Sequence, residues 1–366
     1  MKITAIAIAM AAATMLTASC AKQAPAEEQD TKTSAPVEQL RARLDAARTD
    51  GQVLFGHHDD PVYGHSWNGD EGRSDVLEVC GEYPAVMNWD LGGLENGDAA
   101  NLDSVPFDRM KREIVAQDAR GGVNSFSWHL RHPLTNVDSW ATADTAAVSA
   151  LVNTLEGRAA LEKSVDAIAD FFLSLKNSEG EPIAVIFRPW HEHTGNWFWW
   201  GSANSSVDDY KKLWEITRSR FDAKGVDNVL WAYSPDRCNS TEKYLERYPG
   251  DEYADILGAD VYHFGGAEGT AVYFRDALTT LGIAAREAAR RGKLAAFTET
   301  GCESLVVPGW YTECLLPIIS AVPVSYVTVW RNAHDKPQHF YAPYPGHESS
   351  PSFVEFYNNP VTIFVK

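Results

Sequence analysis

The feature that most constrains this chain is a regular alternation of short apolar segments with helical ones. Eight apolar segments occur in order, at residues 52–55, 83–90, 123–129, 182–187, 228–234, 256–262, 294–299 and 324–330. Helical periodicity is clearest at 37–50, 107–120, 161–176, 208–224, 271–291 and 352–357. Strands that alternate with helices in this way form parallel sheets. Eight units fit a single closed (β/α)8 TIM barrel of the α/β class, which usually has about 200–400 residues.

The competing architecture is an open, doubly wound sheet. That fold commonly carries a glycine-rich phosphate-binding turn after its first strand, and no such turn follows residues 52–55. The chain also has no internal repeat and no sign of a second domain. We therefore predict one domain at residues 37–366.

The N-terminus is predicted to be a targeting segment. Lys2 supplies a positive charge, residues 3–16 are apolar, and small residues precede Cys20. This pattern resembles a bacterial lipoprotein signal at residues 1–19, in which Cys20 becomes the lipid-anchored end of the mature chain. Residues 20–36 would then be a flexible tether, and the protein would lie in the bacterial cell envelope, on its periplasmic or outer-membrane surface. The alternative is an ordinary secretory signal. A transmembrane anchor is not expected, because the apolar run at 3–16 is shorter than the about 20 residues that a membrane span needs.

Composition excludes some partners. The chain has 32 Lys and Arg against 50 Asp and Glu, a net charge of −18, which argues against nucleic acid and anionic membrane surfaces. A neutral polymer is indifferent to that charge. The four cysteines after Cys20 allow three full disulfide pairings or none, and their spacing suggests no metal site: Cys80, Cys238, Cys302 and Cys314.

Polar or aromatic residues follow every predicted strand. In a parallel barrel all strand ends meet at one rim, where barrel enzymes keep their active sites. Many of the 12 tryptophans lie at or just after these ends: Trp89, Trp128, Trp140, Trp190, Trp197, Trp199, Trp200 and Trp330. Aromatic faces stack on the apolar faces of sugar rings, so this distribution favours a carbohydrate ligand. Trp214 falls within a helix and is expected in the core.

Two glutamates stand out because each comes at the end of an apolar segment. Glu192 lies in RPWHEHTGNWFWWG, residues 188–201, after the fourth predicted strand, and Glu299 ends the seventh. Glycoside hydrolysis needs two carboxyl groups across the scissile bond. The residues alone do not say which would be the acid and which the nucleophile. Glu303, in the turn beyond Glu299, is expected to be solvated, and residues 188–201 could also be an aromatic surface loop without function.

A family resemblance adds roles to these residues. FRPWHEHTGNWFWWG at 187–201 resembles the signature of glycoside hydrolase family 26, the β-mannanase family. FGH at 55–57, GADVY at 258–262, FTETG at 297–301 and VWR at 329–331 are similar to further family motifs, in the expected order. The resemblance covers roughly residues 40 to 360. It implies a (β/α)8 barrel and a retaining double displacement, with Glu192 as the acid/base and Glu299 as the nucleophile.

The resemblance also implies substrate contacts. His191 would touch the sugar at the cleavage point, and Tyr262 would hydrogen-bond the nucleophile. The subsites on the non-reducing side of the cut would be lined by His129, Trp197, Trp330 and Arg331. Arg188 and Asp260, at strand ends, complete the predicted substrate-binding set. For a retaining enzyme the two catalytic carboxyl groups should be about 5–5.5 Å apart.

The resulting expectation is an endo-acting β-1,4-mannosidase on mannan, galactomannan or glucomannan, a monomer that needs no metal or other cofactor. Three alternatives stay open. The enzyme could release mannobiose from chain ends, it could act on mixed-linkage β-glucan, or it could be a glycan-binding lipoprotein without catalysis. The sequence also leaves open whether Trp199 and Trp200 stack on sugar or brace their loop.

Overall fold

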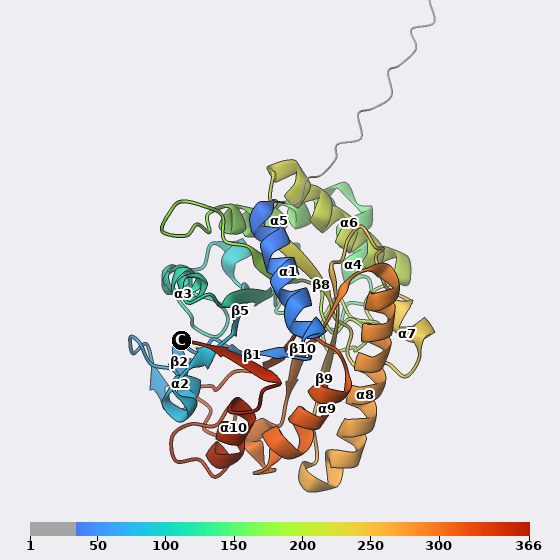
Figure 1. Ribbon diagram of the computed structural model, residues 1–366. Helices are drawn as coiled ribbons and strands as arrows, with labels where there is room; N and C mark the ends of the chain where they lie inside the picture. The colour runs from blue at the N-terminus through green and yellow to red at the C-terminus, as the bar shows by residue number, and fades with distance from the viewer. Residues whose placement is uncertain (1–33) are drawn as a thin grey trace, which may run out of the picture. The chain divides into compact units, whose positions relative to one another are not determined.

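Eight parallel strands close into a barrel in the computed structural model, which describes residues 34–366 (Figure 1). The order is β11-β10-β9-β8-β7-β6-β5-β1, and β11 pairs with β1 to close the ring. The strands are β1 (Val53–His58), β5 (Val86–Asp90), β6 (Val123–Ser127), β7 (Val185–Arg188), β8 (Val229–Tyr233), β9 (Ile256–Tyr262), β10 (Leu294–Gly301) and β11 (Tyr326–Val329). Each corresponds to one of the eight predicted segments, so the closed TIM barrel is confirmed. The predicted leader at 1–19 and Cys20 lie outside the described residues.

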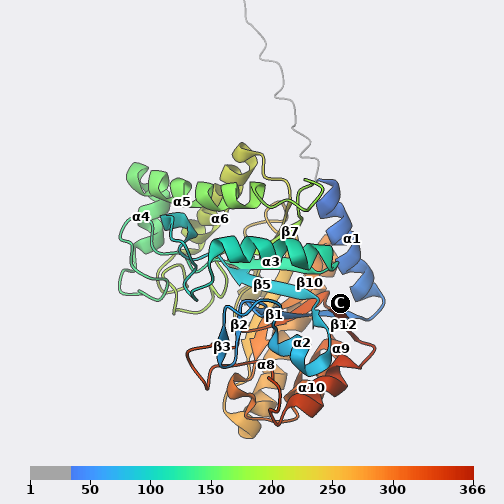
Figure 2. The same cartoon turned by 90° about the vertical axis from the view of Figure 1, so that its left-hand side faces the viewer.

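Helices surround this barrel, as the two perpendicular views show (Figures 1 and 2). They are α1 (Ala35–Thr49), α2 (Asp75–Cys80), α3 (Phe107–Ala119), α4 (Ala147–Asn153), α5 (Leu155–Leu173), α6 (Val207–Lys224), α7 (Thr241–Leu245), α8 (Gly266–Arg291), α9 (Leu316–Ala321) and α10 (Ser350–Tyr357). Their apolar faces point inward: α1, for example, buries Val37, Leu40 and Leu44. Each strand is covered by helices on its outer side and packed in the barrel on its inner side, so it is buried at almost every position. This is why the strand sequences are nearly continuous apolar runs.

Short elements complete the connections. Strand β12 (Thr362–Val365) joins the start of β1, and β4 (Tyr83–Pro84) pairs antiparallel with β12. A hairpin of β2 (Tyr63–Gly64) and β3 (Trp67–Asn68) follows β1. There are also two short 3-10 helical turns, η1 (Leu94–Asn96) and η2 (Glu303–Leu305), and a π-helical turn, η3 (Tyr311–Leu315), precedes α9. The sequence did not predict β12, α2, α4 or α7, because elements of four to seven residues carry too little periodicity.

The longest elements stand together on one side of the barrel. β9 and β10 have seven and eight residues, and α8, which connects them, has 26. A register shift between Ala296 and Glu299 marks a bulge where β10 pairs with β9. Bulges re-aim side chains and are common beside active sites. Here the bulge includes Glu299.

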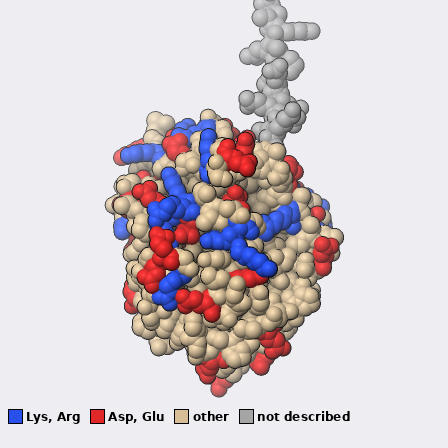
Figure 3. All heavy atoms as spheres, turned by 60° about the vertical axis from the view of Figure 1, so that its left-hand side comes forward, with Lys and Arg blue, Asp and Glu red and all other residues tan. Residues whose placement is uncertain are grey.

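Three further observations bear on the sequence predictions. Acidic and basic side chains are interspersed on the face drawn in Figure 3. Within residues 34–366, no helix combines the length and apolar character that crossing a membrane requires. The cysteines left open for pairing, Cys80, Cys238, Cys302 and Cys314, are all free thiols in the structure.

Candidate active site

Glu192 lies at the barrel rim in the connection after β7. The strand ends at Arg188, and Glu192 follows it by four residues, in the segment predicted to come after the fourth strand. Its backbone has φ 54°, in the left-handed region that is uncommon for residues other than glycine. Its amide donates to the Ser234 carbonyl after β8 at 2.8 Å, which fixes the turn to the neighbouring strand. A strained backbone held in this way aims a side chain, and here it aims a carboxylate.

The surroundings of Glu192 favour its protonated form. Burial raises the pKa of this carboxyl well above its usual value, and the negative charges of Glu299, Asp260 and Asp236 raise it further. One hydrogen bond acts in the opposite direction, because Trp197 Nε1 donates to Glu192 Oε2 at 2.6 Å. A carboxylic acid that keeps its proton near neutral pH can act as a general acid.

Glu299 is held on both of its oxygens. The Tyr262 hydroxyl donates to Oε1 at 2.6 Å, and Arg188 Nη2 pairs with Oε2. Glu299 is only 5% exposed and Arg188 is fully buried, so water does not screen this contact. A cation and a hydroxyl donor both favour an ionised carboxylate with a fixed orientation. The predicted contact between Tyr262 and Glu299 is present.

Arg188 connects Glu299 to a second buried acid, Asp260. Its Nη1 donates to Asp260 Oδ2 at 2.7 Å and to the Ser234 hydroxyl at 3.2 Å. Asp260 also accepts hydrogen bonds from Ser234 at 2.8 Å and from Thr298 at 2.6 Å. Burial raises the pKa of Asp260 to about 7, although the Arg188 guanidinium lowers it. Of the two predicted substrate contacts at strand ends, Arg188 therefore binds Glu299 directly and Asp260 binds Arg188.

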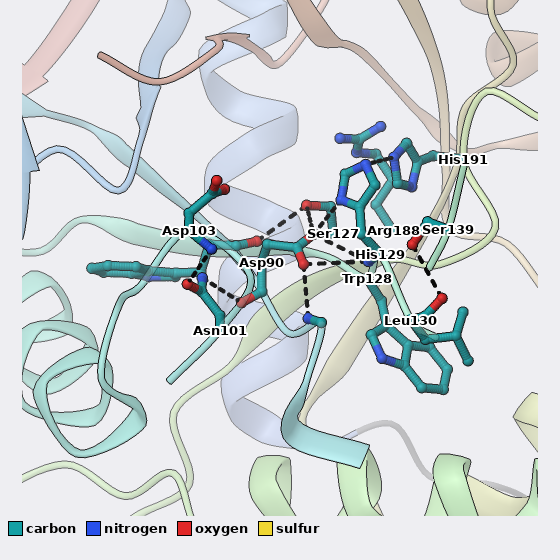
Figure 4. A network of polar contacts seen from close by, with 12 residues as sticks. Asp90, Asn101, Asp103, Ser127, Trp128, His129, Leu130, Ser139, Arg188 and His191 are labelled. Carbon is teal, nitrogen blue, oxygen red and sulfur yellow. Dashed lines mark hydrogen bonds and ion pairs between the residues drawn. The ribbon is translucent and has the colours of Figure 1, made fainter. Parts of the chain in front are cut away.

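His129 and His191 form a second network (Figure 4). His129 Nδ1 donates to Asp90 Oδ2 at 2.7 Å, and its Nε2 lies 3.2 Å from His191 Nε2. Burial alone would raise the pKa of Asp90, but His129 and hydrogen bonds from Ser127 and Gly92 hold it below its usual range. Burial lowers the pKa of His191 well below its ordinary value, so this ring is neutral.

Three predicted sugar contacts line one cavity. His129, Trp330 and Arg331 border a space of about 390 Å³ at the rim, in the connections after β6 and β11. Arg331 is fixed by an ion pair of 2.9 Å with Asp103, which also lines the cavity. No sequence pattern marked Asp103, because it lies in the irregular connection between η1 and α3. Trp197, predicted with this group, is not among the cavity's lining residues and contacts Glu192 instead.

The tryptophans at the strand ends divide into buried and partly exposed side chains. Five of the eight at strand ends are fully buried: Trp89, Trp128, Trp190, Trp199 and Trp200. Trp199 donates to the Leu130 carbonyl at 3.2 Å and Trp200 to the His191 carbonyl at 2.8 Å, so both brace the rim. These five therefore pack in the protein interior, which is the commoner role of any single tryptophan. Trp140, Trp197 and Trp330 retain exposed surface, and Trp214 is in the core as expected.

Among the described residues, one group could hold a metal ion. His58, Asp59 and Asp103 are buried, and each offers a ligand atom within 4.8 Å of the others. Arg331 already supplies a positive charge here through its pair with Asp103. The group lies by the β1 and β11 ends, and the catalytic glutamates are not part of it.

A family model agrees with this geometry. The model for glycosyl hydrolase family 26 matches residues 30–297, which is most of the chain. The chain belongs to glycosyl hydrolase family 26. The match includes Glu192, the strands from β1 to β9 and the first part of β10, and the motif around residues 187–201 that suggested the family lies within it.

Proteins similar to this chain are also mannan-degrading enzymes by name. A mannan endo-1,4-β-mannosidase from Bifidobacterium adolescentis is 35% identical over 238 residues, covering 63% of this chain and 24% of that protein. An enzyme of the same name from Bacillus subtilis is 32% identical, covering 59% and 60%. The chain thus matches a quarter to three fifths of these relatives' length. Among solved structures, a GH26 β-mannanase from Bacteroides ovatus is 46% identical with a TM-score of 0.88, covering 91% of this chain and 95% of that one.

Proposed function

We propose that this protein is a retaining endo-β-1,4-mannosidase that acts on mannan, galactomannan or glucomannan. One observation carries the proposal: two glutamates with opposite environments share the rim of a family 26 barrel. Glu192 has a pKa raised by burial, while Glu299 is bound by a guanidinium and a tyrosine hydroxyl. That division is what an acid and a nucleophile require. The names of the relatives support mannan as the substrate.

In the first step Glu299 attacks the anomeric carbon while the glycosidic C–O bond breaks. Glu192 gives its proton to the departing oxygen, and a covalent glycosyl-enzyme remains. Arg188 and Tyr262 keep Glu299 pointed at the carbon. Because Glu192 is protonated at rest, it needs no further proton source.

In the second step the ionised Glu192 takes a proton from water, and the water oxygen attacks the anomeric carbon. The bond to Glu299 breaks, which restores both carboxyl groups and retains the anomeric configuration. This mechanism needs carboxyl groups about 5–5.5 Å apart, and that spacing stays a prediction. It uses no metal or organic cofactor.

The sugars on the non-reducing side of the cut would occupy the cavity lined by His129, Trp330 and Arg331. Asp90 orients His129 and Asp103 orients Arg331, so both contacts are fixed before substrate arrives. His191 lies next to Glu192 in sequence and would meet the sugar at the cleavage point. Trp197, through its bond to Glu192, would sit at the same point.

The test is hydrolysis of linear mannan by the purified protein. Endo action predicts a rapid fall in viscosity with mixed oligosaccharide products, whereas mannobiose as the sole early product would indicate an exo-acting enzyme. Glu192→Ala and Glu299→Ala should each abolish activity on mannan, and azide should partly restore Glu299→Ala with an inverted product. Full activity in either variant would end the proposal.

We also propose, from the sequence, that the mature protein is anchored to the envelope through a lipid on Cys20. Lys2, the apolar run at 3–16 and the small residues before Cys20 support this. Expression in a bacterial host with labelled palmitate should label the wild type and not Cys20→Ala. Equal labelling of both would refute the anchor.

A further inference from the structure

A cavity of about 750 Å³ lies beside the catalytic rim, and the mechanism above does not use it. It is bordered by the connection after β8 and by α7 and α8, with these lining residues: Asp236, Arg237, Cys238, Asn239, Lys243, Arg275, Asp276, Thr279 and Thr280. Figure 1 shows α7 and α8 next to each other on this side of the barrel. Its size is in the range of ligand sites, about 300–1,000 Å³.

The cavity begins next to the acid. Asp236 is two residues beyond Ser234, whose carbonyl binds the Glu192 amide at 2.8 Å. The carbonyl of Pro235 accepts from the Asp260 amide at 3.1 Å, so the whole turn is fixed to the catalytic network. The negative charge of Asp236 also raises the pKa of Glu192.

The strand order of the barrel indicates whether this cavity lies on the non-reducing side or on the leaving-group side of the scissile bond. Glu192 follows β7 and Glu299 is on β10, so the pair divides the rim into two arcs. One arc contains β11, β1, β5 and β6 and includes the cavity of His129, Trp330 and Arg331. The other contains β8 and β9 and includes Asp236. If the first arc takes the non-reducing side, the second takes the leaving group.

The position and lining of the cavity suit a branch better than the main chain. Its lining comes from the connection after β8 and from α7 and α8, and no barrel strand contributes a residue to it, whereas a polysaccharide backbone would run over the strand ends. None of its lining residues is aromatic, so it offers no platform for stacking a sugar face. It offers instead guanidinium, carboxylate, amide and hydroxyl groups, which bind the hydroxyl edges of a sugar.

Each cation of the lining has a carboxylate partner, so the lining does not favour an anionic ligand. Arg275 and Arg237 lie 2.8 Å and 3.8 Å from Asp276, and Arg237 lies 3.5 Å from Asp236. The ammonium of Lys243 pairs with Glu246 at 2.6 Å. The cations are therefore already neutralised, and a neutral polyhydroxyl group fits such a lining. The floor is fixed, because Thr280 of α8 accepts from the Cys238 amide at 3.1 Å.

We infer that this cavity binds a neutral hexose branch, of the kind galactomannan carries, attached to the leaving-group side of the mannan chain. The inference rests on the proposed mannanase activity. It makes Arg237 and Asp276 determinants of branch tolerance that take no part in bond cleavage.

The test compares Arg237→Ala and Asp276→Ala with wild type on galactomannan and on the same polymer after α-galactosidase treatment. We expect kcat/KM on the branched polymer to fall about five- to tenfold in each variant, as loss of one ordinary hydrogen bond predicts, with little change on the debranched polymer. Arg48→Ala is the matched control, since it breaks an exposed ion pair of 2.6 Å with Asp45 on α1. It should leave both substrates unaffected.

An aryl β-mannobioside separates this inference from the proposed function. Its leaving group carries no sugar, so all variants should cleave it at the wild-type rate, which also shows that they fold. If Arg237→Ala and Asp276→Ala lose kcat/KM equally on the branched and the debranched polymer, the cavity does not bind the branch. If their kcat/KM on galactomannan is unchanged, the cavity is not a substrate-binding site. A wild-type protein inactive on all three substrates would instead refute the mannanase proposal itself.

Discussion

Arg188→Met tests whether the buried guanidinium holds the site together. Arg188 is the cationic partner of both Asp260 and Glu299, and all three side chains are buried. Methionine fills much of the same volume but leaves two carboxylates without a cation. Removing one partner of a buried ion pair costs about 3–5 kcal/mol, because an uncompensated charge remains in a poorly solvated place. We expect the free energy of unfolding to fall by about that amount at pH 8.

The loss should depend on pH. Burial raises the pKa of Asp260 to about 7, so at pH 5 this carboxyl takes a proton and no longer needs the cation. The difference between wild type and Arg188→Met should therefore be smaller at pH 5 than at pH 8. Urea unfolding followed by tryptophan fluorescence measures both values.

A matched control shows what a surface pair contributes. Arg220→Met removes a partly exposed pair of 2.6 Å with Asp166, between α5 and α6, and should cost about 0–1 kcal/mol. Arg188→Lys should lose an amount of stability between those of Arg188→Met and Arg220→Met, since an ammonium keeps the charge but lacks the forked guanidinium that reaches both acids. If Arg188→Met loses no more stability than Arg220→Met, the reasoning is wrong.

Three further outcomes are expected. Trp197→Phe removes the hydrogen bond that favours ionised Glu192, so the pKa of Glu192 should rise and the alkaline limb of the kcat/KM profile should move to higher pH; an unmoved limb contradicts this. Asp90→Asn should raise KM for mannan about tenfold with little change in circular dichroism, because His129 loses its carboxylate; an unchanged KM would exclude that role. Asp260 has a higher pKa in the folded than in the unfolded protein, so wild type loses folding free energy as pH rises from about 4 to about 7. Asp260→Asn should not show this loss, and its stability relative to wild type, measured by unfolding at several pH values, should therefore increase over that pH range.

The sequence predicted the barrel well because the signal is local and repeated. Each strand of the ring is buried on both sides, and consecutive buried positions must be apolar. β9 spans the same residues as its predicted segment. Glu192 and Glu299 were visible for the opposite reason, since a charged residue directly after or within such a segment interrupts an otherwise apolar pattern.

The roles of Trp199 and Trp200, which the sequence left open, depend on tertiary packing. Trp199 and Trp200 stand beside Trp197 in the chain, yet Trp197 contacts Glu192 and the other two are fully buried. Tryptophan has both a large apolar surface and an N–H donor, so it serves equally well as a sugar platform or as a brace bonded to a carbonyl. Only the surrounding packing separates these uses.

The sequence by itself determined the number and order of strands, the family motifs and the two glutamates. It did not determine which groups hold them. Arg188 meets Asp260 and Glu299 across 72 and 111 residues of chain, and His129 meets Asp90 across 39. Pairings between distant residues leave no mark in local periodicity, since they arise only when the barrel closes and brings strand ends to one rim. The tertiary structure therefore decided which carboxyl group keeps its proton and which is paired with a cation.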